Sequence, residues 1–275
     1  GTAPLLWMGV TAFKHKTDAT SRVVKFLPTA ADRSASDYEE THVFAPTTDG
    51  FAQLQEPRRG GDISFWHCLG NSVLISGLST VLAVMLGTCC AYGFSRFQVA
   101  GSKDWLFFIL STRFMPPLAV VAPVFLMYTK LGLTDTHIGL MILYTAFNLS
   151  LAVWLMKGFI DEIPRAFEEA ALIDGYTRFQ AFYKIILPQA RTGMAVTAVF
   201  CLIASWNELG FAMTLNRGAA VTIPTFFEGM KGRTEGIPWP EVAAGALLFV
   251  VPIVVFTILV RRHLLRGVTF GTVKG

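Results

Sequence analysis

Charged residues are scarce in this 275-residue chain, and their scarcity is the first constraint on its class. Asp, Glu, Lys and Arg make up 15% of the sequence, whereas a typical soluble domain carries about 25%. Apolar residues make up 53%, and the charges are segregated, so long segments carry almost none. The composition therefore argues against a soluble domain and favours a membrane protein. The net charge of +4 is mild and lies in short loops, so we expect no nucleic-acid partner.

Signatures of enzymes and metal sites are also missing. A phosphate-binding loop needs Gly-x-x-x-x-Gly-Lys-Ser/Thr, and the chain contains no Gly-Lys pair, so it should not hydrolyse ATP by itself. The five histidines are scattered, and no nucleophile elbow or pair of catalytic carboxylates stands out. We therefore expect no catalytic residue, no metal site and no cofactor bound by this chain.

Cysteine is rare, and its placement is uninformative about chemistry. Cys68, Cys89, Cys90 and Cys201 lie in or at the edge of apolar segments. Their spacing fits neither a metal site nor a disulfide framework. We expect four buried thiols that pack as small apolar side chains.

Five apolar segments are long enough to cross a bilayer, because about 20 helical residues span its ~30 Å core. They are 68–94, 105–128, 137–156, 194–214 and 242–260. Segment 4–13 is too short to span. Because the chain opens with Gly rather than Met, we expect residues 1–13 to be the remnant of a first transmembrane helix; a cleaved signal peptide is the alternative. The fold class is therefore all-α, a polytopic transmembrane helical bundle of six helices with the first incomplete.

Among the short loops and the C-terminal tail, basic residues are concentrated on one side of the predicted bundle, which indicates its orientation; the long segment 14–66 on the other side carries seven more, balanced by its acids. The first side carries Arg96, Lys103, Lys157, Arg165, Arg178, Lys184, Arg191, Arg261, Arg262, Arg266 and Lys274. The short loops of the other side carry four basic residues, so we place the first side, with the tail 262–275, in the cytoplasm. Segment 14–66 is then an external loop, which we expect to be irregular apart from one short helix. The five-helix core is 67–261.

The loop 158–190 within this core has the pattern of two short helices joined by a sharp turn. Pro164 suits a first helical turn, and Gly175 suits the left-handed position that ends a helix. Thr177 and Gln180 form a capping-box pattern that starts the next helix. Periodicity alone leaves open a second interpretation, an amphipathic loop that rests on the membrane surface.

Spacing in this loop resembles the EAA motif of ABC importer permeases. Glu169-Ala170-Ala171 is followed by three residues and Gly175, then by nine residues, Ile185, one residue and Leu187-Pro188. Tyr176 departs from the family, in which many members have Ala. Asn71-Ser72, 91–97, Trp206-Asn207-Glu208 and 267–275 are similar to the maltose-type carbohydrate permeases, so the resemblance extends from Trp66 to the end of the chain.

The resemblance implies the type I ABC importer permease fold and a coupling helix that sits in a cleft of a cytoplasmic ATPase subunit. The implied ATPase-coupling residues are Glu168, Glu169, Ala170, Ala171, Asp174, Gly175, Ile185, Leu187 and Pro188. A similar C-terminal tail implies a second ATPase contact, and its alternative is a frayed end. The implied tail residues are Gly271, Val273, Lys274 and Gly275.

Polar residues inside the predicted spans mark a candidate substrate path, because such residues are costly in a membrane. Asn148, Trp206, Asn207 and Glu208 combine amides with an aromatic ring, which suits a sugar; hydrogen bonding between helices is the alternative. For Arg113 we expect a gate or structural role, without an ion pair to Glu208, since the two lie at different depths.

Small and proline residues shape the predicted helices around this path. Pro116, Pro117 and Pro123 should kink the helix that contains them. Small residues recur at every fourth position of the preceding helix and predict close helix packing. They are Ser79, Ala83, Gly87 and Ala91.

The sequence thus predicts a permease subunit of a binding-protein-dependent ABC importer in the bacterial cytoplasmic (inner) membrane, multi-pass, with a cytoplasmic C-terminus. It would move a sugar or polyol by alternating access. Implied partners are a second homologous permease, a dimer of ATPase subunits that binds ATP and Mg, an external solute-binding protein and the lipid bilayer. An ion-coupled secondary transporter that uses Glu208 is one alternative, and a non-transporting scaffold is another. Dependence of uptake on ATP separates the importer from the secondary transporter, and any solute flux excludes the scaffold.

Overall fold

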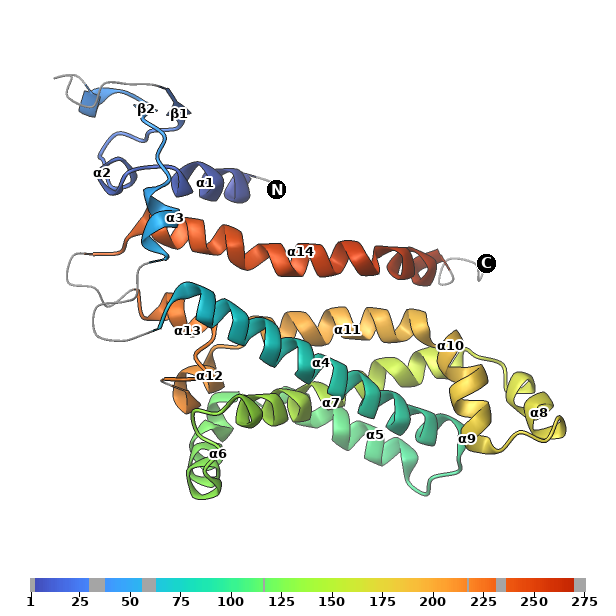
Figure 1. Cartoon of the computed structure of the whole chain (residues 1–275). Helices are drawn as coiled ribbons and strands as arrows, with labels where there is room; N and C mark the ends of the chain where they lie inside the picture. Colours follow the sequence, from blue (N-terminus) through green and yellow to red (C-terminus); the bar gives the residue numbers. More distant parts are fainter. Residues whose placement is uncertain are drawn as a thin grey trace. The chain divides into compact units, whose positions relative to one another are not determined.

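The computed structural model describes residues 3–29, 38–55, 63–115, 117–216, 218–230 and 236–269, which are mostly helical (Figure 1). The chain divides into two compact units. The first unit comprises Gly1–Ser72 and Ala220–Ile253, and the second comprises Val73–Ala219 and Val254–Gly275. The predicted all-α class is confirmed.

Within the described residues, three helices are long and apolar enough to cross a membrane without interruption. They are α4 (Phe65–Arg96), α7 (His137–Asp161) and α14 (Trp239–Thr269). At 1.5 Å per residue, the 25 residues of α7 extend about 37 Å, more than the ~30 Å core of a bilayer. Three of the five predicted spans are therefore continuous helices.

The predicted span 105–128 is instead divided into two helices. Helix α5 (Ser102–Ser111) continues into the 3₁₀ turn η2 (Thr112–Phe114), and Met115 is extended, with φ −67° and ψ 122°. Helix α6 (Pro117–Leu131) follows, bent by more than 40° from the preceding helical stretch. A proline disfavours helical backbone at the residue before it, which agrees with the predicted kink. Pro123 lies inside α6, and Pro116 lies outside the described residues.

The predicted span 194–214 is wrong in its bounds. Helix α11 (Arg191–Trp206) ends eight residues earlier than expected, and α12 (Gly210–Leu215) is a separate short helix. The Glu208 carboxylate accepts hydrogen bonds from the backbone N–H of Phe211 (2.9 Å) and Ala212 (3.1 Å). These bonds satisfy donors that an interrupted helix exposes at its first turn, so Glu208 stabilises the break.

Small residues bring α4 and α7 close together, as predicted. Ser79, Ala83 and Ala91 are fully buried, and a Cβ on Gly87 would lie 2.5 Å from the Cβ of Ala152 in α7. The buried positions of α4 recur here as adjacent pairs every four residues: 83 and 84, 87 and 88, 91 and 92. The opposite face of the helix is exposed in this chain.

The expectation of four buried thiols is half wrong. Cys68 and Cys201 are buried, whereas Cys89 and Cys90 are exposed. The reason is the helical period, because both positions lie away from the face of α4 that packs on α7.

The segment 14–66, expected to be an irregular loop, contains several ordered elements. Helix α1 (Ala3–Ala12) precedes the segment, which itself contains α2 (Lys16–Ala19), η1 (Tyr38–Glu40) and α3 (Asp49–Gln53). Two short strands, β1 (Leu27–Pro28) and β2 (Val43–Phe44), pair in parallel. Prediction failed here because these elements are too short to produce a period in the sequence.

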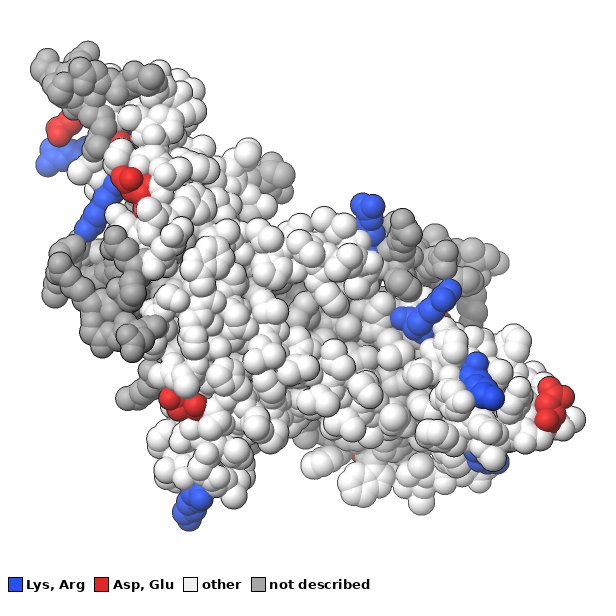
Figure 2. Space-filling model, in the orientation of Figure 1, with Lys and Arg blue, Asp and Glu red and all other residues white. Residues whose placement is uncertain are grey.

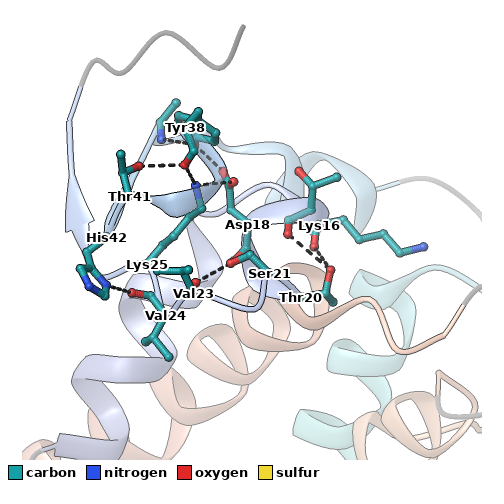
Figure 3. Close-up of polar contacts among 12 residues, drawn as sticks. Lys16, Asp18, Thr20, Ser21, Val23, Val24, Lys25, Tyr38, Thr41 and His42 are labelled. Carbon is teal, nitrogen blue, oxygen red and sulfur yellow. Dashed lines mark hydrogen bonds and ion pairs between the residues drawn. The ribbon is translucent and has the colours of Figure 1, made fainter. Parts of the chain in front are cut away.

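A buried polar cluster holds this segment together (Figure 3). The Lys25 ammonium donates to the Tyr38 carbonyl at 2.7 Å and lies 3.5 Å from the centroid of the Tyr38 ring. The Tyr38 hydroxyl donates to Asp18 at 2.9 Å, and the other Asp18 oxygen is 3.7 Å from the Lys25 nitrogen. Burial of the two charges is tolerable because each has partners.

The rest of the first unit packs α1, α3, the start of α4, α13 (Ile223–Glu228) and the start of α14 around one apolar core. Phe65 and Phe226 meet edge to face, with centroids 5.6 Å apart. The Asn71-Ser72 pair of the sequence motif joins α4 to the start of α13. Asn71 donates to the Val221 carbonyl at 3.0 Å, and Ser72 accepts from the N–H of Ile223 at 2.9 Å.

Candidate functional site

The loop with the EAA-like spacing folds into what we term the connecting unit, residues 166–189. It consists of α8 (Ala166–Ile173), α9 (Arg178–Ala181), the π-helical turn η3 (Phe182–Ile186) and α10 (Leu187–Gln189). Figure 1 shows it between α7 and α11. The expectation of short helices joined by a turn is confirmed.

The turn and cap of the connecting unit have the predicted geometry. Gly175 has φ +85°, the left-handed region that glycine adopts without strain. The N–H of Tyr176 donates to the Ala171 carbonyl at 3.0 Å, which closes the end of α8. Thr177 and Gln180 form both bonds of a capping box, 3.2 Å and 2.8 Å long.

The predicted coupling residues divide into a buried and an exposed set. Glu168 and Ala171 are 5% and 4% exposed, so they face the body of the second unit. Ile185 and Leu187 are half-buried. The exposed set comprises Glu169, Ala170, Asp174, Gly175 and Pro188.

Large apolar side chains on the connecting unit are also exposed. Ile173 is 86% exposed and Phe179 74%, and Phe167 and Tyr183 are about half exposed. A concentration of apolar surface on a polar, loop-like unit is typical of a protein–protein contact. Charged side chains gather around this end of the second unit in Figure 2, whereas the helical surface between the ends is almost uncharged.

The buried face of the connecting unit packs against the ends of α4 and α7. Its apolar core brings together Tyr92 of α4, Ile160 of α7 and Ile186 of η3. The rings of Tyr92 and Phe182 are 4.6 Å apart. The unit is thus fixed to two membrane helices as well as to its neighbours in sequence.

An ion pair that sequence reasoning missed lies beside this core. The Nε of Arg96, the last residue of α4, donates to Glu168 at 3.1 Å, and the Tyr92 hydroxyl donates to the other oxygen of the same carboxylate. Arg165 donates to the Ser95 carbonyl at 2.9 Å. Two sequence features could have revealed this pair. Arg96 closely follows an apolar span, and Glu168 directly precedes the EAA-like residues of the loop.

A cavity of about 220 Å³ lies within the second unit and contains part of the predicted path, and we term it the polar cavity because five of its nine lining residues are polar or charged. It is lined by Arg113, Met115, Tyr144, Phe147, Asn148, Ala204, Ser205, Glu208 and Phe211. The structure therefore brings Asn148 and Glu208 together, with Arg113 beside them.

Hydrogen bonds join the polar residues of this cavity. Arg113 donates to the Phe147 carbonyl at 3.2 Å and to the Asn148 side chain at 3.3 Å. The Asn148 amide donates in turn to Ser205 at 2.6 Å and to the Cys201 carbonyl at 3.2 Å. The network links η2, α7 and α11 across the cavity wall.

The remaining predicted path residues lie elsewhere. Trp206 is buried and Asn207 is exposed, with its side-chain amide donating to the Ile203 carbonyl at 2.8 Å. Neither lines the polar cavity. Arg113 and Glu208 form no ion pair among the described residues, as expected.

The remaining predicted site residues, and the cavity residues that sequence reasoning missed, are as follows. Pro117 begins α6, whereas Pro116, Gly271, Val273, Lys274 and Gly275 lie outside the described residues. Sequence reasoning missed Tyr144, which is four residues before Asn148 and therefore on the same face of α7. It also missed Ser205 and the rings of Phe147 and Phe211, 4.9 Å apart.

A larger hollow of about 630 Å³ lies along α5 and α7, and its lining is mainly apolar. Leu106, Leu110 and Trp154 contribute to it, with Lys157 and Asp161 ion-paired at its edge. Both hollows expose mainly apolar surface, and the smaller one differs in the hydrogen-bonded group around Asn148 and the Tyr144–Glu208 pair in its wall, so we regard the smaller cavity as the candidate solute site. Within the described part of the chain, no three His, Cys, Asp or Glu residues are grouped to hold a metal ion.

Comparison with known proteins finds relatives along most of the chain. A family model described as "Binding-protein-dependent transport system inner membrane component" matches residues 80–269. A trehalose transport system permease protein of Mycobacterium tuberculosis is 36% identical over 217 residues, which cover 78% of this chain and 79% of the relative.

Two solved structures have a similar fold. One is a bacterial ABC transporter involved in the import of the acidic polysaccharide alginate, with a TM-score of 0.71 and 20% identity over 95% of this chain and 90% of that chain. The other is a bacterial alginate ABC transporter in complex with an alginate pentasaccharide-bound periplasmic protein. It matches with a TM-score of 0.59 and 20% identity over 78% of this chain and 81% of that chain.

Proposed function

Because this chain belongs to the family of inner membrane components of binding-protein-dependent transport systems, we propose that it carries a sugar or polyol through the membrane. The chain is a multi-pass membrane protein and the permease subunit of an ABC importer, not an enzyme. The matched residues, 80–269, include the connecting unit and the polar cavity. The similarity to these importers gives no support to the ion-coupled alternative.

The connecting unit is the observation that carries the proposal. It exposes Glu169, Ile173 and Phe179 while its other face is packed against α4 and α7. A transporter subunit that hydrolyses no ATP itself needs such a surface to receive work from a separate ATPase. We infer that α8 is the coupling helix and that it fits a cleft of the ATPase subunit.

The choice of a sugar or polyol rests on two observations. The trehalose transport relative is 36% identical over most of the chain. The polar cavity also combines aromatic rings with hydroxyl, amide, carboxylate and guanidinium groups from Tyr144, Asn148, Glu208 and Arg113. Ring stacking and several hydrogen bonds are what a polyhydroxylated solute needs.

The proposed assembly contains a second homologous permease, a dimer of ATPase subunits and an external solute-binding protein. ATP and Mg would bind the ATPase subunits. The tail residues Gly271, Val273, Lys274 and Gly275 would make a second contact with the ATPases. The solved alginate transporter in complex with an alginate pentasaccharide-bound periplasmic protein has a similar fold, and by analogy it supports the external solute-binding protein as a partner.

The orientation that fits this assembly places the chain in a bacterial cytoplasmic membrane. The connecting unit and the C-terminus would face the cytoplasm with the ATPases, which agrees with the larger share of Lys and Arg in the short loops and tail of that side. Segment 14–66 would then lie outside, on the side of the binding protein.

Alternating access follows from these parts. ATP would close the two ATPases on each other and carry the paired coupling helices with them. The membrane helices fixed to the connecting unit would move as well, opening the cavity to the outside, and hydrolysis would return it. The protein's own residues bind the solute and transmit the movement.

Reconstitution of the complex, purified from its native membrane, into liposomes tests the proposal. Labelled sugars and polyols are supplied with the binding protein, and uptake is measured with and without ATP. ATP-dependent uptake is expected, and Glu169→Arg should abolish co-purification of the ATPase. Glu162→Arg, at an exposed acid just before the connecting unit, is the matched control. Uptake that persists without ATP and follows a proton gradient would contradict the proposal.

A further inference from the structure

We propose that Glu168 is a positioning residue that joins the coupling helix to the membrane helices through Arg96, and that it does not contact the ATPase. The inference rests on the proposed function and concerns how movement of α8 reaches the solute cavity. The EAA-like spacing alone would group Glu168 with its exposed neighbour Glu169. The structure separates the two residues by burial and by partner.

The Glu168 carboxylate has both oxygens engaged by α4. One accepts the Tyr92 hydroxyl, and the other accepts Arg96 Nε at 3.1 Å. The side chains of Arg96 and Glu168 are 4% and 7% exposed, so the pair is shielded from water. Glu169 is exposed, about 100° further around the helix. Only the second acid is available to a partner that approaches α8.

Arg96 is the centre of a junction between three elements. Beyond Glu168 of α8, its guanidinium donates to the carbonyls of Ile160 (3.2 Å) and Ile163 (2.8 Å), at the end of α7. It also donates to the Ser95 hydroxyl at 3.1 Å. Five N–H donors in a fixed fork can hold three elements at once, which the single ammonium of lysine cannot do with the same geometry.

The surrounding residues brace the junction. The Ser95 hydroxyl donates to Asp161, whose other oxygen pairs with Lys157 one helical turn earlier in α7. Arg165, just before α8, donates to the Ser95 carbonyl. The ends of α4 and α7 and the start of α8 are therefore connected by charged and hydrogen-bonded groups as well as by apolar packing.

Movement of α8 must then carry α4 and α7 with it or break this buried network. Helix α7 also carries Tyr144 and Asn148 of the polar cavity. Helices α4 and α7 are in close contact at Gly87 and Ala152, so they can move as one body. A junction of this kind has the properties of a coupling element between the ATPase contact and the cavity.

The test compares four variants in the reconstituted complex: Glu168→Gln, Tyr92→Phe, Arg96→Lys and the matched control Glu162→Gln. Three quantities are measured: ATPase subunits retained per permease, ATP hydrolysed, and solute imported per ATP. Glu168→Gln and Arg96→Lys should retain the ATPases while solute imported per ATP falls about fivefold or more, within the range seen for residues along coupling networks. Glu162→Gln should match the unmutated complex in all three.

Tyr92→Phe is the variant that tests the junction with the least risk of unfolding the protein, because it removes only the hydroxyl that donates to Glu168. It should lower import per ATP in the same direction by a smaller factor. Loss of the ATPases from Glu168→Gln with unchanged import per ATP in the remaining complexes would mean that Glu168 contacts the ATPase, and it would overturn the inference. Unchanged values for Glu168→Gln and Arg96→Lys would also overturn it. Absence of ATP-dependent uptake in the unmutated complex would instead refute the proposed function itself.

Discussion

The Tyr144 hydroxyl donates a 2.8 Å hydrogen bond to the Glu208 carboxylate, which joins the middle of α7 to the break between α11 and α12. The other contacts of Glu208 are the N–H groups of Phe211 and Ala212. A carboxylate with three donors around it is stabilised in place as a helix cap. Its role is therefore first to shape the cavity wall and the start of α12.

Glu208→Ala should destabilise the protein by about 1–3 kcal/mol, because it leaves the first-turn donors of α12 and the Tyr144 hydroxyl unpaired. Tyr144→Phe removes one bond and should cost about 1 kcal/mol. Thermal unfolding in detergent measures both. Uptake by Tyr144→Phe should remain dependent on ATP and independent of a proton gradient. Equal stability of Glu208→Ala and the unmutated protein would contradict the capping role.

Arg113→Gln should weaken solute binding more than assembly. Arg113 lines the polar cavity, and its guanidinium donates hydrogen bonds to the Phe147 carbonyl and to the Asn148 side chain. Loss of a charged donor that contacts a hydroxylated solute is worth about 1–3 kcal/mol, which corresponds to roughly a 5- to 150-fold rise in the KM for uptake. Titration of uptake against solute concentration measures it, with ATPase retention as the control. A lower maximal rate at unchanged KM would assign Arg113 to structure alone.

Two alanine substitutions in α4 should have opposite signs. Gly77→Ala should stabilise the protein by up to about 1 kcal/mol, since a Cβ there meets nothing within 4 Å and alanine is the better helix former. Gly87→Ala should destabilise it by about 1–3 kcal/mol, because the added Cβ would clash with Ala152. Chemical or thermal unfolding of the two variants side by side decides the point. A stabilised Gly87→Ala would show that α4 and α7 are not in close contact.

Gly175→Val should strain the turn of the connecting unit. A β-branched residue at φ +85° costs about 1–2 kcal/mol, although the site has room for the side chain. ATPase retention and import should both fall, and Gly175→Asn should be milder because asparagine tolerates this conformation. Gly158→Ala, in α7 with open space around it, is the control and should retain activity. Full import by Gly175→Val would show that the turn can be rearranged without cost.

Lys14 should make the stability of the first unit depend on pH. Burial lowers the pKa of Lys14 from 10.5, and nearby Asp18 partly opposes this; the ammonium lies 4.2 Å from the Trp7 ring centroid. Because the unfolded chain binds this proton more tightly, Lys14 favours unfolding at neutral pH, and the free energy of unfolding should rise as pH increases from the folded pKa towards 10.5. Lys14→Met should flatten this rise, as measured by thermal unfolding between pH 7 and 10. An unchanged pH profile would contradict it.

Local sequence was sufficient wherever neighbours along the chain determine structure. The long apolar runs predicted α4, α7 and α14, and the small residues of α4 predicted close packing on another helix, which the structure identifies as α7. Gly175 and the Thr177–Gln180 capping box predicted the turn of the connecting unit. Each of these features depends on residues within one or two helical turns of each other.

Sequence reasoning failed where partners are distant in the chain. Glu208 looked like a polar residue inside a span, but its bonds to Tyr144 and to the start of α12 interrupt the helix there. Cys89 and Cys90 looked buried, since composition does not say which face of a helix is covered.

The sequence by itself determined that this is a helical membrane permease with a loop of EAA-like spacing, because hydrophobic length and motif spacing are properties of the linear chain. Only the tertiary structure decided which acid of that loop faces the membrane helices. Glu168 and Arg96 are 72 residues apart and pair only when the end of α4 meets the start of α8. Burial and partner choice depend on that meeting, since a charge leaves water at tolerable cost only where another chain segment supplies its counter-charge and hydrogen bonds.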